Sequence, residues 1–121
     1  MNFRHENLDV WKLSMDLVSR IYLLTEKFPS QENFGLISQL RRAATSISLN
    51  IAEGSGRSTK KDFASFIRNA IGSLLEVDTA LKISINIKYM DNELYQNEYE
   101  ELIKELYFKL IKLNKSLKNV K

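Results

Sequence analysis

Apolar residues recur every three or four positions along almost the whole chain, which is the spacing of one face of an α-helix. The longest stripe begins at Phe63 and continues to Ile85, for about six turns. The stripes break near Pro29, near the Gly54–Gly56 segment and near Asp91. The pattern therefore predicts an all-α protein, an up-and-down bundle of four long helices joined by short connections.

The first helix is expected from about residue 8 to residue 27. Ser30 or Asn33 is expected to cap the second helix by accepting a hydrogen bond from a free backbone amide. Gly54 or Gly56 is expected to end that helix in a left-handed conformation.

The third helix is expected to begin at Thr59, because Thr followed three residues later by Asp62 resembles a capping box. It should reach Met90, and the fourth helix should then begin at a cap supplied by Asp91 or Asn92. The apolar stripe of the fourth helix continues unbroken toward the C-terminus, which predicts one continuous helix.

Gly72 lies inside the predicted third helix. A glycine in a helix interior costs about 1 kcal/mol relative to alanine. We therefore expect a second helix backbone to approach closely at this position.

The helix predicted between residues 39 and 57 has more apolar surface than one contact needs. Its core stripe is Leu40, Ala44, Ile47 and Ile51, and a second stripe of small and apolar residues lies beside it. The first helix likewise carries an apolar flank next to its core stripe, which fits either a second contact or a helix that is well buried within one bundle. Such surplus surface predicts a homo-oligomer. The interface residues expected on these two helices are Trp11, Met15, Val18, Tyr22, Leu49 and Ala52.

Length and composition fit a single domain over residues 1–121, with 44% hydrophobic residues available for a core. The chain contains no cysteine, so neither a disulfide nor a thiolate site is expected. Its charged N-terminal residues do not resemble a signal peptide, and no run of apolar residues is long enough to span a membrane. We expect a soluble, cytoplasmic protein without a membrane partner.

The net charge of +3 is concentrated in one region of the chain. Residues 39–68 include six basic residues and only two acidic ones. These six are the candidate nucleic-acid-binding residues, Arg41, Arg42, Arg57, Lys60, Lys61 and Arg68. One copy of such a patch would hold phosphate backbones weakly, whereas several copies in an oligomer would concentrate the charge.

The residues needed for catalysis are scarce, so no enzyme activity, metal site or cofactor is expected. The only histidine, His5, lies in an N-terminal segment that is expected to fray. The Gly54–Arg57 segment lacks the Gly-Lys-Ser/Thr sequence of a phosphate-binding loop. Two carboxylates that could point inward, those of Glu53 and Glu76, are expected to pair with an arginine, namely Arg41, Arg42 or Arg68.

The Gly54–Arg57 turn has three interpretations. It could belong to a helix-turn-helix, although the following helix is long and carries a continuous core stripe, unlike a recognition helix. It could be a basic corner, in which Arg57, Lys60 and Lys61 surround a helix N-terminus that favours anions. It could also be a solvated turn without a ligand.

Several segments resemble the four-helix-bundle proteins encoded in intervening sequences of bacterial 23S ribosomal RNA genes. The segments most specific to that family are Asn50-Ile51-Ala52-Glu53-Gly54 and Gly72-Ser73-Leu74 with Glu76. Other matching residues occur along the chain from Leu8 onward. The sequence departs from the usual family pattern at Ser48 and Ser55, where proline and an aromatic residue are common.

The resemblance implies an antiparallel bundle that assembles into a ring, commonly of five subunits, without known catalysis. The chain is also similar to accessory variability determinant proteins of diversity-generating retroelements, which act beside a reverse transcriptase and bind nucleic acid through a basic surface. By position, the family pattern supports only Arg42 and Arg57, and the charge pattern supplies the other basic candidates.

Two functions follow from these observations. The chain could be a binding module whose basic patches hold RNA or DNA backbones. Alternatively, it could be a scaffold for another protein that makes no contact with nucleic acid. The local excess of basic residues slightly favours the binding module.

Overall fold

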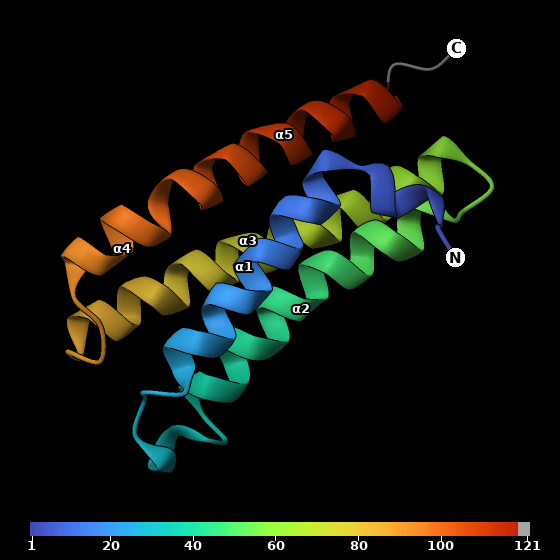
Figure 1. Ribbon diagram of the computed structural model, residues 1–121. Helices are drawn as coiled ribbons and strands as arrows, with labels where there is room; N and C mark the ends of the chain where they lie inside the picture. The colour runs from blue at the N-terminus through green and yellow to red at the C-terminus, as the bar shows by residue number, and fades with distance from the viewer. Residues whose placement is uncertain (119–121) are drawn as a thin grey trace.

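Residues 1–118 are described in the computed structural model of the chain, and every regular element within them is helical (Figure 1). The long helices are α1 (Asp9–Thr25), α2 (Leu36–Ser55), α3 (Lys60–Asn86) and α5 (Glu100–Lys118), with the short α4 (Asn92–Glu98) before the last. Two 3-10 helices, η1 (Arg4–Asn7) and η2 (Ser30–Glu32), precede α1 and α2. The predicted all-α class is confirmed, and the last three residues of the predicted domain lie outside the described residues.

The helices enclose one apolar core. α2 packs between α1 and α3, and α5 lies along α3 and also contacts α1. Figure 1 shows α1, α2 and α3 reversing direction one after another, with α4 and α5 returning beside α3. Four side chains with no exposed surface, one from each long helix, mark the centre of the core, Leu17, Leu40, Leu74 and Leu106.

The ends of α2 differ from the prediction. Neither Ser30 nor Asn33 caps the helix, because the chain first forms η2, and the amide of Leu36 instead donates to Glu32 Oε1 at 3.2 Å. At the other end Gly56 has φ of −89°, an ordinary right-handed value. The predicted left-handed termination is therefore wrong, and α2 ends without it.

The predicted start of α3 is confirmed at its cap. Thr59 Oγ1 accepts a hydrogen bond from the amide of Asp62 at 3.1 Å. The helix ends earlier than predicted, at Asn86 rather than Met90, and Lys88 takes a positive φ of 68°. This turn reverses the chain and lets the Met90 side chain fold back into the core, where it is only 5% exposed.

The predicted fourth helix is divided into α4 and α5 at Tyr99. Arg20 of α1 donates to the backbone carbonyl of Glu98, and the Tyr99 hydroxyl donates to the backbone carbonyl of Arg20 at 2.9 Å. Tyr99 has ψ of −38° but φ of −125°, outside the helical range. Burial of the phenol raises the pKa of Tyr99 to about 12. These contacts with α1 account for the break, which periodicity alone does not reveal.

The close approach between helices occurs at Gly54, not at Gly72. A Cβ atom added to Gly54 would lie 2.7 Å from the Cβ of Phe66 and 3.0 Å from the ring of Phe63. A Cβ atom added to Gly72 would meet nothing within 4 Å. The expectation for Gly72 is wrong because this part of α3 faces open space.

The N-terminal segment is folded against α2 instead of frayed. Arg4 donates to the carbonyl of Ser55 at 3.4 Å, and its guanidinium lies 5.5 Å from the centre of the Phe63 ring. The half-buried ring of His5 contacts Trp11 edge-on at 5.0 Å. Residues 1–7 carry no apolar stripe, so periodicity does not predict this short aromatic cluster.

Candidate nucleic-acid interface

A groove with basic walls lies between the first turns of α3 and the last turn of α5. We call it the basic groove, and its volume is about 590 Å³. Its lining residues are Lys60, Lys61, Ala64, Arg68, Leu117 and Lys118. Figure 1 shows the C-terminal end of α5 at the same end of the molecule as the turn that precedes α3.

Helical spacing sets the shape of the basic groove. Lys61, Ala64 and Arg68 are three and four residues apart, so they share one face of α3. Lys61 and Arg68 are about 10 Å apart along the helix axis. Ala64 and Leu117 are buried and form an apolar floor, while Lys118 enters from α5. The groove therefore places cations around a short apolar surface.

The cations of the basic groove are not neutralised by the rest of the described chain. Within residues 1–118, none of Lys60, Lys61, Arg68 and Lys118 forms an ion pair with a carboxylate. Among the described residues, none that lines the groove is acidic. The amides at the start of α3 add a positive potential of their own, because the first N–H groups of a helix have no partner within it. Anions are the ligands that such a site favours.

Arg57 does not line the basic groove, and its guanidinium is already engaged. Its guanidinium forms an ion pair with Glu53 at 2.7 Å and lies 4.7 Å from the centre of the Phe66 ring. Glu53 is thus paired with Arg57 and not with the predicted Arg41, Arg42 or Arg68.

Arg41 and Arg42 lie near the opposite end of α2. Arg41 donates to Thr25 Oγ1 at 2.8 Å and covers the Tyr22 ring at 4.4 Å, so it fastens α2 to α1. Arg42 is exposed and lies fifteen residues before Arg57, a separation of about 20 Å along the helix. The six predicted cations therefore do not form one patch, and only Lys60, Lys61 and Arg68 come together.

Lys118 is the member of the basic groove that the sequence analysis missed. It belongs to a series of lysines near the C-terminal end of α5, where the helix dipole favours cations, so its charge alone does not indicate a binding site. The antiparallel packing of α5 on α3 could have indicated its position, because it brings the end of one helix beside the start of the other.

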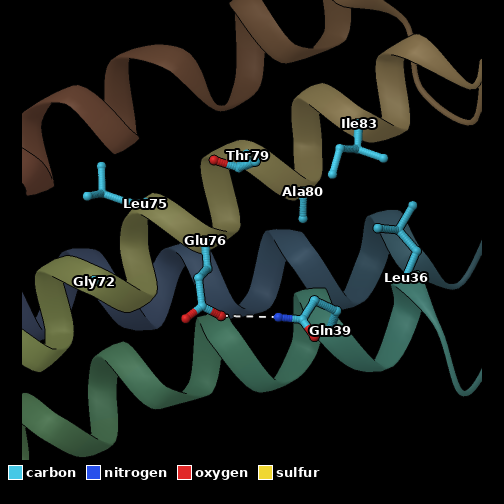
Figure 2. A pocket seen from close by; sticks show the side chains of 8 residues that line it. All are labelled: Leu36, Gln39, Gly72, Leu75, Glu76, Thr79, Ala80 and Ile83. Carbon is cyan, nitrogen blue, oxygen red and sulfur yellow. Dashed lines mark hydrogen bonds between the residues drawn. The ribbon is translucent and has the colours of Figure 1, made fainter.

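The segments that carry the family resemblance fasten α2 to α3. The Asn50 side chain donates to the carbonyl of Ser46 at 2.8 Å, and Ser73 Oγ donates to Ser46 Oγ at 2.9 Å. Gln39 Nε2 donates to Glu76 at 3.1 Å (Figure 2). Glu76 is therefore held by an amide and not by the predicted arginine.

A second, apolar groove runs between α2 and α3 and has a volume of about 440 Å³. Figure 2 shows its lining residues, Leu36, Gln39, Gly72, Leu75, Glu76, Thr79, Ala80 and Ile83. Leu75 and Ile83 are 52% and 46% exposed, so two large apolar side chains of α3 are accessible in this groove. The sequence does not predict this apolar groove, since a close helix contact was expected at Gly72, where a Cβ atom would meet nothing within 4 Å.

The predicted oligomer interface is divided between core and surface. Trp11 and Val18 pack against the core, and Ala52 is half-buried. Met15, Tyr22 and Leu49 remain exposed, at 42%, 39% and 66%. The three exposed residues form the part of this prediction that is accessible to another molecule.

Within residues 1–118, no helix is long and apolar enough to cross a membrane. The same residues contain no group of three or more His, Asp or Glu side chains placed to hold a metal ion.

Comparison with known proteins places the chain in a family. Residues 6–112 match the family described as 23S rRNA-intervening sequence protein. The fold is similar to a crystal structure of a protein of unknown function from the S23 ribosomal protein family of Bacteroides thetaiotaomicron, with a TM-score of 0.64. That similarity covers 89% of this chain and 94% of the other at 24% identity. No curated protein matches the chain. Because the family match spans most of its length, this chain belongs to the 23S rRNA-intervening sequence protein family.

Proposed function

We propose that the protein is a non-catalytic nucleic-acid-binding protein that holds phosphate backbones in the basic groove. The observation that carries this proposal is a set of four cations, Lys60, Lys61, Arg68 and Lys118, without carboxylate partners among the described residues. A lysine or arginine that has no ion-pair partner within its own chain is available for a phosphate.

Binding of this kind depends on charge and not on base sequence. The flexible lysine side chains and Arg68 contact phosphate oxygens, which carry no sequence information. The two ends of the groove on α3 are about 10 Å apart, so one chain contacts only a few phosphates. Affinity from a single copy is therefore modest.

Assembly into a homo-oligomer would raise that affinity by multiplying the contacts. The proposed unit is an antiparallel up-and-down four-helix bundle, with α4 and α5 as one arm, supported by the packing of α1, α2, α3 and α5. The surface of Met15, Tyr22 and Leu49 supports self-association, and the family resemblance suggests a ring of five. The proposed setting is the cytoplasm.

The second candidate function is a protein-interaction scaffold. The apolar groove between α2 and α3 favours it, because a partner that covers Leu75 and Ile83 would remove their exposed apolar surface from water. In this case nucleic acid would not bind, and the basic groove would be a solvated surface.

The test replaces Lys60, Lys61 and Arg68 together with alanine and measures binding of labelled RNA and DNA by fluorescence anisotropy. The matched control replaces three exposed cations away from the groove, Lys12, Lys27 and Arg42. We expect the groove variant to lose most of its affinity and the control variant to keep most of it. Circular dichroism should show unchanged helix content in both variants.

Equal losses in the two variants would mean that binding follows overall charge, and the basic groove would then have no special role. Absence of binding by the unmodified protein would remove the nucleic-acid function and leave the scaffold.

A further inference from the structure

One large aromatic side chain stands exposed on the outer face of α5. Phe108 is 63% exposed, and the edge of its ring packs against Tyr107 with the ring centres 5.4 Å apart. Lys104 and Lys112 lie one helical turn before and after it, and Lys115 lies two turns after it, on the same face. Lys104 pairs with Glu101 at 3.9 Å, and Glu105 lies three residues before Phe108, so the unpaired cations of this face lie on the C-terminal side of the ring.

The C-terminal end of α5, beyond this face, reaches the basic groove with Lys118. Phe108 precedes Lys118 by ten residues on α5, a distance of about 15 Å along the helix axis. The acidic residues of α5, at positions 100, 101 and 105, all precede Phe108. Within residues 1–118, Lys112, Lys115 and Lys118 form no ion pairs. Three unpaired lysines thus follow Phe108 along α5 toward the groove.

We propose that Phe108 is a stacking platform for a base of single-stranded nucleic acid whose backbone follows Lys112 and Lys115 to the basic groove. This inference rests on the proposed function and names its ligand more closely. Single strands can present an unstacked base to an aromatic side chain, whereas a duplex keeps its bases stacked inside. The combination of an exposed ring and a positive track is the arrangement by which proteins hold single strands without reading their sequence.

Charge complementarity favours this occupant over a second copy of the chain. The face on the C-terminal side of Phe108 is positive, and a protein partner would have to supply carboxylates opposite Lys112 and Lys115. A phosphate backbone supplies the negative charges at regular intervals along its length.

The experiment compares binding of a labelled oligothymidylate with binding of a duplex of equal length. Phe108→Ala should weaken single-strand binding by roughly five- to a hundredfold, which is the range for loss of one base–aromatic stack. Duplex binding should change little. Phe108→Trp should keep the single-strand affinity, and Phe108→Leu should lose it, because leucine retains apolar area but cannot stack.

Each possible outcome distinguishes this inference from the function on which it rests. If single strands and duplexes bind equally and Phe108→Ala changes neither, the stacking role is wrong while backbone binding stands. If the unmodified protein binds neither, both proposals fall. If Phe108→Ala instead changes the molar mass measured by light scattering, Phe108 belongs to a contact between copies, and the stacking proposal is overturned. The exposure of this side chain makes unfolding of the variants an unexpected result.

Discussion

Gly54 of α2 and Phe66 of α3 are so close that a Cβ atom on the glycine would lie 2.7 Å from the Cβ of the phenylalanine. The backbone of Phe63 is also near, with its carbonyl oxygen 3.3 Å from the same position. This contact fixes the separation of α2 and α3 next to the turn that leads into the basic groove. Absence of a side chain at residue 54 is therefore a condition for the packing of these helices.

Two glycine substitutions should change stability in opposite directions. Gly54→Ala should lower the free energy of unfolding by about 1–3 kcal/mol, because the new methyl group overpacks the helix contact. Gly72→Ala should raise it by about 0.4–1 kcal/mol, because the methyl group meets open space and alanine favours the helix. Urea denaturation followed by circular dichroism measures both. A Gly54→Ala protein as stable as the unmodified one would show that the helices separate easily.

The hydroxyl of Tyr99 should contribute measurably to stability at neutral pH. Tyr99→Phe removes the hydrogen bond to the Arg20 carbonyl and should cost about 0.5–1.5 kcal/mol. Tyr107→Phe is a suitable control, since Tyr107 is only partly buried against the core. Equal unfolding free energies for the Tyr99→Phe and unmodified proteins would contradict this assignment.

The same residue predicts a dependence on pH. Burial raises the pKa of Tyr99 to about 12 in the folded protein, from an ordinary value of about 10 in the unfolded chain. The folded state thus holds the proton more tightly, and the stabilisation is complete below about pH 10 and disappears as pH rises toward about 12. The stability difference between unmodified protein and Tyr99→Phe should shrink over this interval. Thermal melting at a series of alkaline pH values tests the sign.

Salt should weaken nucleic-acid binding in proportion to the phosphates contacted. The slope of log affinity against log salt concentration is about −0.9 for each duplex phosphate and about −0.7 for each single-strand phosphate. The alanine variant of Lys60, Lys61 and Arg68 should have a flatter slope than the unmodified protein. An unchanged slope would mean that these three residues do not contact phosphates.

Self-association should depend on the exposed apolar residues of α1 and α2. Leu49→Glu should reduce the molar mass measured by light scattering, because it places a charge on the proposed contact surface. Leu23→Glu provides a control at an equally exposed leucine, 64% against 66%, on a different face of α1 from Met15 and Tyr22. A monomeric unmodified protein, or a larger effect at Leu23, would show that the interface was wrongly chosen.

Periodicity was sufficient to locate the core of the fold. Leu40, Ala44, Ile47 and Ile51 were predicted from spacing alone, and each is completely buried. Helix ends were less accessible to prediction, since Leu36 uses a cap from Glu32 that depends on the intervening 3-10 turn. The break at Tyr99 likewise depends on Arg20, a residue far away in the sequence.

The candidate site was predicted only in part, for a physical reason. Lys61 and Arg68 are seven residues apart on one helix, so their spacing in the sequence is enough to place them on the same side of it, with Lys60 about 100° away around the axis. Lys118 lies beside them because α5 packs on α3, and the spacing of residues along one helix does not predict contacts between two helices. Arg41 was assigned to the surface by its charge, although it serves the contact between α1 and α2.

The basic groove also has a cost for the empty protein. Lys60, Lys61 and Lys118 bring positive charges from two helices to one place, and like charges repel when no anion lies between them. This repulsion should lower the stability of the protein when no ligand is bound. Lys118→Gln should therefore raise the melting temperature at low salt and weaken nucleic-acid binding. Added polyphosphate should stabilise the unmodified protein more than the variant. A variant with a higher melting temperature and a lower binding affinity would show that the charges of this groove favour binding and reduce the stability of the fold.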